Sequence, residues 1–97
     1  MPIVFTPQLF AILSQSNHEK IHAALETKFP SSYLVLFTGQ WLLVTSGVTV
    51  KEVSDQLGIS IGDSGSAVVI AGTGSYFGRA NPEIWEWLKS RLGIPNA

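Results

Sequence analysis

The 97-residue chain has no cysteine, and only 13% of its residues are charged. The absence of cysteine excludes disulfide bonds, thiolate zinc sites and a cysteine nucleophile. Six Lys and Arg are set against seven Asp and Glu, and these charges form no run of one sign. Nucleic acids are bound largely through Lys and Arg side chains that neutralise phosphates. We therefore expect nucleic-acid binding to be weak or absent.

Long hydrophobic segments are also lacking. No apolar run approaches membrane-spanning length, and the N-terminus has neither the basic nor the apolar region of a secretory signal. We therefore expect a soluble cytoplasmic protein with no membrane partner. The length fits one domain over residues 1–97.

Hydrophobic residues are abundant, at 45% of the chain. With so few charges, a monomer would expose contiguous apolar surface. The simplest way to cover such a surface is a second copy of the same chain, so we expect a homodimer. Another protein partner is the alternative.

Apolar runs at residues 9–14, 33–37, 40–45 and 67–71 are typical of strands. The second and third runs are separated by a turn around Gly39 and predict a hairpin. The last three runs are apolar on both faces, at residues 34–37, 41–44 and 67–70, whereas a sheet with one wet face alternates apolar and polar residues. Both faces of the predicted sheet therefore need cover.

Two helix starts show the capping-box spacing, in which Ser or Thr is followed three residues later by Glu. These pairs are Ser16 with Glu19, where Asn17 is a competing cap, and Thr49 with Glu52. A third helix is predicted from residue 81, where Asn, Pro and Glu follow one another, to a stop at residue 93. The resulting order, βαββαβα, predicts an α+β ferredoxin-like fold with sheet order 4-1-3-2 and an added C-terminal helix.

The third helix has an apolar stripe formed by Ile84, Trp85, Leu88 and Leu92. Trp87 projects away from this stripe, which makes it either an interface anchor or a partly exposed side chain on the rim of its own domain. Large aromatic side chains at or beyond the strand ends are the other candidates for the dimer interface. The predicted interface residues are Tyr33, Trp41, Tyr76, Phe77 and Trp87.

His18, Glu19 and His22 form an H-E-x-x-H pattern on the first predicted helix. In metalloproteases, two histidines so spaced bind zinc and the glutamate activates water. Here His18 lies in the first helical turn and no further histidine follows. The alternative is two histidines that border the apolar stripe of the helix. A third zinc ligand would have to come from Glu52, Glu83 or Glu86.

Two glycine-rich stretches have weaker patterns. Residues 62–66, G-D-S-G-S, match the nucleophile loop of chymotrypsin-like proteases, but the chain is too short for their two barrels. We expect a turn there. Residues 72–74, G-T-G, follow a strand and form either an anion-binding nest or a bend at the strand end.

The block WLLVTSGVTVKEVSDQLG, followed by a polar loop and SAVVIAGTGSYFG, resembles the small SinR-like proteins of bacteria. Those proteins look like distant relatives of the VapD ribonucleases and of CRISPR-associated ferredoxin-like proteins that assemble as dimers. The resemblance covers residues 9–78 and implies a ferredoxin-like dimer.

One departure bears on activity. Relatives with proposed nuclease activity carry an acidic residue at the end of the first strand, where it would hold a divalent cation. Residues 14–17 here read Ser-Gln-Ser-Asn, and the loop before the fourth strand keeps only Asp63. The nuclease activity is therefore not carried over.

Three functions remain open from the sequence. The leading hypothesis is a non-enzymatic dimeric interaction module without a cofactor, which binds a protein or, weakly, nucleic acid. The second is a zinc-dependent hydrolase in which Glu19 is catalytic and His18 and His22 hold the metal. The third is a degenerate nuclease relative that acts on RNA.

Overall fold

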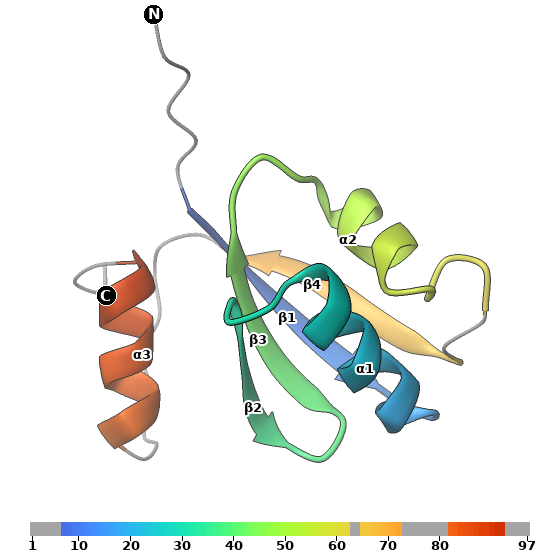
Figure 1. Cartoon of the computed structure of the whole chain (residues 1–97), viewed down its shortest axis with the longest axis horizontal. Coiled ribbons are helices and arrows are strands. Elements are labelled where there is room, and N and C mark those ends of the chain that lie inside the picture. The colour runs from blue at the N-terminus through green and yellow to red at the C-terminus, as the bar shows by residue number, and fades with distance from the viewer. Residues whose placement is uncertain (1–6, 63–64, 73–81, 93–97) are drawn as a thin grey trace, which may run out of the picture.

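A computed structural model describes residues 7–62, 65–72 and 82–92 (Figure 1). Its elements are β1 (Gln8–Ser14), α1 (His18–Lys28), β2 (Tyr33–Phe37), β3 (Gln40–Thr45), α2 (Val50–Gln56), β4 (Ala67–Gly72) and α3 (Pro82–Leu92). The predicted element order is confirmed, and the predicted bounds of all four strands agree to within one residue. The predicted cap and stop of α3, Asn81 and Gly93, lie outside the described residues.

The four strands form one antiparallel sheet in the order β2-β3-β1-β4. This is the predicted 4-1-3-2 order read from the other edge, with β1 and β3 in the centre. Figure 1 shows α1 and α2 on one face of the sheet and α3 apart from them, on the side away from β4. The α+β ferredoxin-like fold with an added helix is thereby confirmed.

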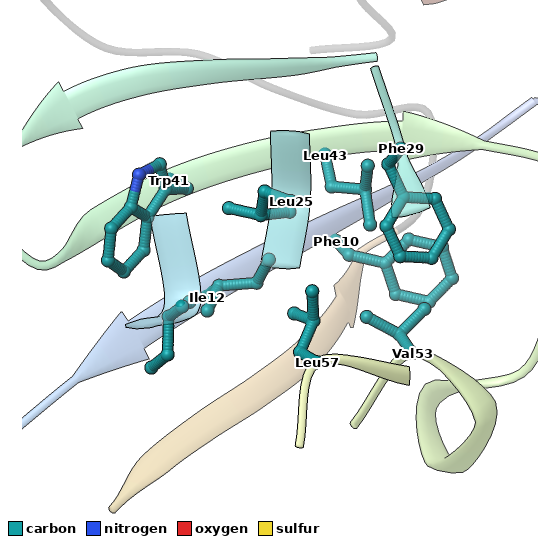
Figure 2. Packing of buried hydrophobic residues seen from close by; sticks show 9 residues of the cluster. Phe10, Ile12, Leu25, Phe29, Trp41, Leu43, Val53 and Leu57 are labelled. Carbon is teal, nitrogen blue, oxygen red and sulfur yellow. The ribbon is translucent and has the colours of Figure 1, made fainter. Parts of the chain in front are cut away.

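The core lies between the sheet and the two helices α1 and α2. Successive side chains of a strand point to opposite faces, so Phe10 and Ile12 of β1 share the helix-covered face with Trp41 and Leu43 of β3, their partners in register. Figure 2 shows these side chains against Leu25 of α1. The most completely buried side chains are Phe10, Ile12, Ile21, Leu25, Leu43, Val53 and Leu57. Each such side chain contributes about 1.5–3 kcal/mol by burial.

The two capping-box predictions have different outcomes. At α2, Thr49 Oγ1 accepts a hydrogen bond from Glu52 N at 3.1 Å and Glu52 Oε1 accepts one from Thr49 N at 3.0 Å, so the box is confirmed. At α1 the Ser16–Glu19 box is wrong and the competing candidate, Asn17, is the N-cap residue, although its side chain makes no capping bond. The hydroxyl of Ser16 instead accepts a hydrogen bond from Ser66 N at 3.2 Å, which ties the start of β4 to the end of β1.

Candidate functional site

One face of the sheet is covered by α1 and α2, and we call the other face the open face. Part of the open face is an apolar surface. In the antiparallel pairing of β1 with β4, Leu13 lies opposite Val68 and Ala11 opposite Ile70. These residues alternate with the buried Phe10 and Ile12, so they point to the open face. Leu13, Val68 and Ile70 are 42%, 52% and 50% exposed. The β1–β4 half of the open face is therefore bare among the described residues.

The cover of the open face is uneven. Val44 of β3 is buried although it lies opposite Leu9 and so points to the same face as Leu13. In α3, Leu88 is also buried. The sequence analysis left open whether α3, a partner or both cover this face. Within the described residues, Leu13, Val68 and Ile70 are the exposed large apolar side chains that β1 and β4 contribute to the open face.

The two edges of the sheet differ in regularity. β4 pairs with β1 without a register shift, and it contains no charged residue and no proline. Charged residues and proline normally protect an edge strand from pairing with another chain. β2 is also uncharged and exposes apolar side chains, but its pairing with β3 is broken by a bulge between Val35 and Phe37. A bulge twists an edge and hinders further pairing. The β4 edge is therefore the better surface for a partner.

The predicted interface residues fall in different surroundings. Trp41 needs a correction, because it is 2% exposed in the core and retains almost no surface for a partner. Tyr33 is partly buried and hydrogen-bonded within the chain. Trp87 is also partly buried, with the Arg91 guanidinium 5.4 Å from its ring centroid. Tyr76 and Phe77 lie outside the described residues. The prediction overlooked Leu13, Val68 and Ile70, because their strands are apolar at successive positions and the sequence does not show which side chains the helices cover.

A second feature is a cavity of about 200 Å³ where the first turns of α1 meet the β2–β3 hairpin. We call it the ring pocket, because half of its lining residues carry aromatic or imidazole rings. Its lining residues are His18, Glu19, His22, Val35, Phe37, Thr38, Gly39 and Trp41. It thus contains every residue of the H-E-x-x-H pattern that was proposed to act on zinc.

The close approach of His18 to the hairpin depends on Gly39. This residue has a φ of +83°, and a Cβ atom on it would lie 2.8 Å from His18 Cε1. Real Cβ atoms do not come so near to another heavy atom. The Gly39 carbonyl also accepts a hydrogen bond from Ser14 N at 2.8 Å, which joins the hairpin turn to the end of β1. Glycine therefore lets the imidazole of His18 rest directly on the turn.

Hydrogen bonding determines the tautomer of neutral His18. The Ser14 hydroxyl donates its single proton to the Ser16 carbonyl oxygen at 2.8 Å. At its 2.8 Å contact with His18 Nδ1, Ser14 Oγ must therefore be the acceptor, and Nδ1 carries the proton. Nε2 of neutral His18 consequently bears the lone pair.

His22 has the opposite tautomer because of Tyr33 and Glu26. The Tyr33 hydroxyl donates to Glu26 Oε1, so its oxygen accepts a hydrogen bond from His22 Nε2 at 3.1 Å. Desolvation, followed by the hydrogen bond to the Glu26 carboxylate and its charge, raises the pKa of Tyr33 to about 12. The hydroxyl therefore stays protonated at neutral pH and holds His22 in place.

This geometry bears on the zinc hypothesis. Nε2 of His22 is engaged with Tyr33, and zinc would have to displace this bond or use Nδ1. Among the described residues, no three His, Asp or Glu side chains lie close enough together to hold a metal ion. Glu52, Glu83 and Glu86 do not line the ring pocket. Asp63 and most of the G-T-G stretch fall outside the described residues.

In the described part of the chain, no helix has both the length and the apolar character needed to cross a membrane. No protein-family model, curated protein or solved structure matches this chain. The resemblance to the SinR-like proteins therefore stays a prediction that rests on the sequence alone.

Proposed function

We propose that the protein is a non-enzymatic interaction module of the cytoplasm that forms a homodimer through the β1–β4 half of its open face. The observation that carries this proposal is the in-register group of Leu13, Val68 and Ile70, which is about half exposed on a sheet whose other face carries the hydrophobic core. Large contiguous apolar surface on a folded domain marks an interaction site.

A second copy of the chain is the partner that fits this surface best. The same apolar patch on both subunits is self-complementary under a twofold axis, as isologous dimers require. The net charge of −1 gives two copies little reason to repel each other. Burying the exposed half of each of these side chains contributes on the order of 1 kcal/mol, before the entropy of association is subtracted.

Sedimentation equilibrium of three proteins tests the dimer. The wild-type chain should sediment as a dimer, and Ile70→Glu should reduce it to the 10.5 kDa monomer, because a carboxylate would be buried without a partner. Ile61→Glu is the matched control, since Ile61 is 76% exposed but lies in the loop between α2 and β4. It should remain dimeric. A wild-type chain that is monomeric at high micromolar concentration would refute the proposal, and so would a dimer that tolerates Ile70→Glu.

The alternative function is a zinc-dependent hydrolase that uses the ring pocket. One observation favours it: His18 and His22 line the same cavity as Glu19, and the lone pair of neutral His18 is on Nε2, the nitrogen that commonly binds zinc. The bond from His22 to Tyr33 weighs against it. Zinc stoichiometry on chelator-treated protein distinguishes the two functions. One tightly bound zinc that both His18→Ala and His22→Ala abolish would place the hydrolase first.

A further inference from the structure

The edge of the sheet at β4 has a defined main-chain pattern. β4 is an edge strand, with β1 as its only neighbour among the described strands (Figure 1). The Gln15 N–H donates to the Ser66 carbonyl oxygen at 2.8 Å, one step beyond the Ser14–Ala67 pair of the register. In an antiparallel ladder, residues that bond to one neighbouring strand alternate with residues whose N–H and C=O groups point the opposite way. This bond therefore fixes the direction of the main-chain groups along β4.

The groups that point away from β1 belong to alternate residues. Ser66 and every second residue after it direct their main-chain groups to β1. The residues between them direct their N–H and C=O groups outwards, to the side where the described residues place no strand. These residues are Ala67, Val69 and Ala71. Main-chain groups along a free strand edge bind another extended strand, and β4 has no charge or proline to prevent this.

The sequence of β4 reads almost the same in both directions. On the two sides of Val69 lie two β-branched residues, Val68 and Ile70, and beyond them two alanines, Ala67 and Ala71. When two copies run antiparallel with Val69 opposite its own counterpart, every residue meets one of its own kind. Every outward N–H of one copy then lies opposite an outward C=O of the other. A twofold dimer needs such a self-complementary surface, so a second copy fits this edge better than an unrelated strand.

The same register joins the apolar surfaces of the two open faces. Val68 and Ile70 point to the open face and are 52% and 50% exposed. In this register, Val68 of each copy lies opposite Ile70 of the other in a pair without main-chain bonds, where the side chains are closest. Leu13 extends the row on β1, because it lies opposite Val68 within its own chain. Edge pairing therefore brings the apolar patches of both copies side by side.

We propose that two copies of the chain pair antiparallel along β4, with the twofold axis at Val69, and so form one continuous sheet. The two strands are held by main-chain hydrogen bonds between the outward groups and by contacts between Val68 of one copy and Ile70 of the other. This inference rests on the proposed homodimer and specifies its geometry.

Cysteine cross-linking tests the register, because the chain has no cysteine of its own. Val69→Cys would lie opposite itself with the Cα atoms about 5.5 Å apart, within the range of disulfides, about 4.4–6.8 Å. Ala71 is more exposed than Val69, but in this register it would lie about 14 Å from its counterpart. Val69→Cys should therefore form a disulfide-linked dimer at least about tenfold faster than Ala71→Cys under mild oxidation. An equimolar mixture of Ala67→Cys and Ala71→Cys should cross-link faster than either variant alone.

A proline substitution supplies the second arm. Ala71→Pro removes an N–H group that bonds across the seam in this register, while the pairing with β1 keeps its bonds because that N–H points away from β1. The Kd of the dimer in sedimentation equilibrium should rise at least about tenfold, since the twofold axis doubles the loss. Ala71→Thr keeps the N–H group and should dimerise like the wild type. Circular dichroism should give the same spectrum for all three proteins.

The possible failures of the two proposals differ. A wild-type chain that is monomeric at high micromolar concentration would overturn both the homodimer and its pairing along β4. A wild-type dimer in which Val69→Cys cross-links no faster than Ala71→Cys would overturn the β4 pairing alone. So would a folded Ala71→Pro variant that dimerises as tightly as the wild type.

Discussion

The two faces of the sheet are built from the same strands and the same kinds of residue, yet along β1 they differ sharply in cover. On the helix-covered face, Phe10 and Ile12 of β1 are wholly buried. On the open face, their neighbour Leu13 and the β4 residues Val68 and Ile70 remain about half exposed. Composition therefore does not separate core from exposed surface here. The difference arises from which face α1 and α2 happen to cover.

The largest expected effect contrasts two adjacent residues of β1. Ile12→Ala should lower the free energy of unfolding by about 2–5 kcal/mol, because it leaves a cavity among packed side chains. Leu13→Ala should cost less than about 1 kcal/mol at low protein concentration, where the open face is in water. Urea denaturation measures both. If the dimer forms as proposed, the cost of Leu13→Ala should grow with protein concentration. Equal losses at low concentration would contradict the contrast between the faces.

The next effect concerns the turn that supports the ring pocket on the helix-covered side. Gly39 and Gly62 both have a φ of +83°, so Gly→Ala carries the same backbone strain of about 1–2 kcal/mol at either position. A Cβ at Gly62 meets nothing within 4 Å, whereas at Gly39 it collides with the His18 ring. Gly39→Ala should therefore destabilise the protein more than Gly62→Ala in thermal unfolding. Equal shifts of Tm would show that His18 moves away freely.

A smaller effect is expected at the helix starts. Thr49→Ala removes the side-chain bond that caps α2, one of the two helices that cover the packed face, and should cost about 1 kcal/mol. Asn17→Gly is the matched change at α1. The Asn17 side chain caps nothing and its φ of 53° suits glycine, so the cost should be a few tenths of a kcal/mol. Chemical denaturation of both variants compares the caps. A larger loss for Asn17→Gly would contradict this ranking.

Much of the fold could be predicted from the sequence because its signals are local. The four apolar runs, the cap at Thr49 and the spacing of Ile21 and Leu25 each depend on a few neighbouring residues. The failed cap at Ser16 shows the limit. Its hydroxyl bonds to Ser66, 50 residues further along, and local spacing contains no information about that contact.

The candidate sites were harder to predict for the same reason. The H-E-x-x-H pattern located two histidines on one helix, but Tyr33 and Ser14, which determine their tautomers, approach them only in the folded chain. Trp41 was chosen as an interface residue because aromatic side chains often anchor interfaces, whereas its place in the register opposite Ile12 directs it into the core. Side-chain direction within a strand depends on register, which sequence alone did not fix.

The smallest expected effect is a pH dependence at the margin of the packed face, where Tyr33 is partly buried. Desolvation and the bond to Glu26 raise its pKa from 10.0 to about 12, so the folded state holds the phenol proton more tightly than the unfolded state does. The resulting stabilisation is complete below pH 10 and is lost as the pH rises through 12. Tyr33→Phe has no such proton, so its stability should fall less steeply over this window in alkaline denaturation. Glu26→Gln should bring the pKa of Tyr33 back towards 10.0, so tyrosinate absorbance should rise at a lower pH than in the wild type. The absorbance of Tyr33→Phe comes from Tyr76 alone, and subtracting it from the wild-type curve gives the titration of Tyr33. Identical alkaline profiles for wild type and Tyr33→Phe would show that the hydroxyl is as free in the folded chain as in water.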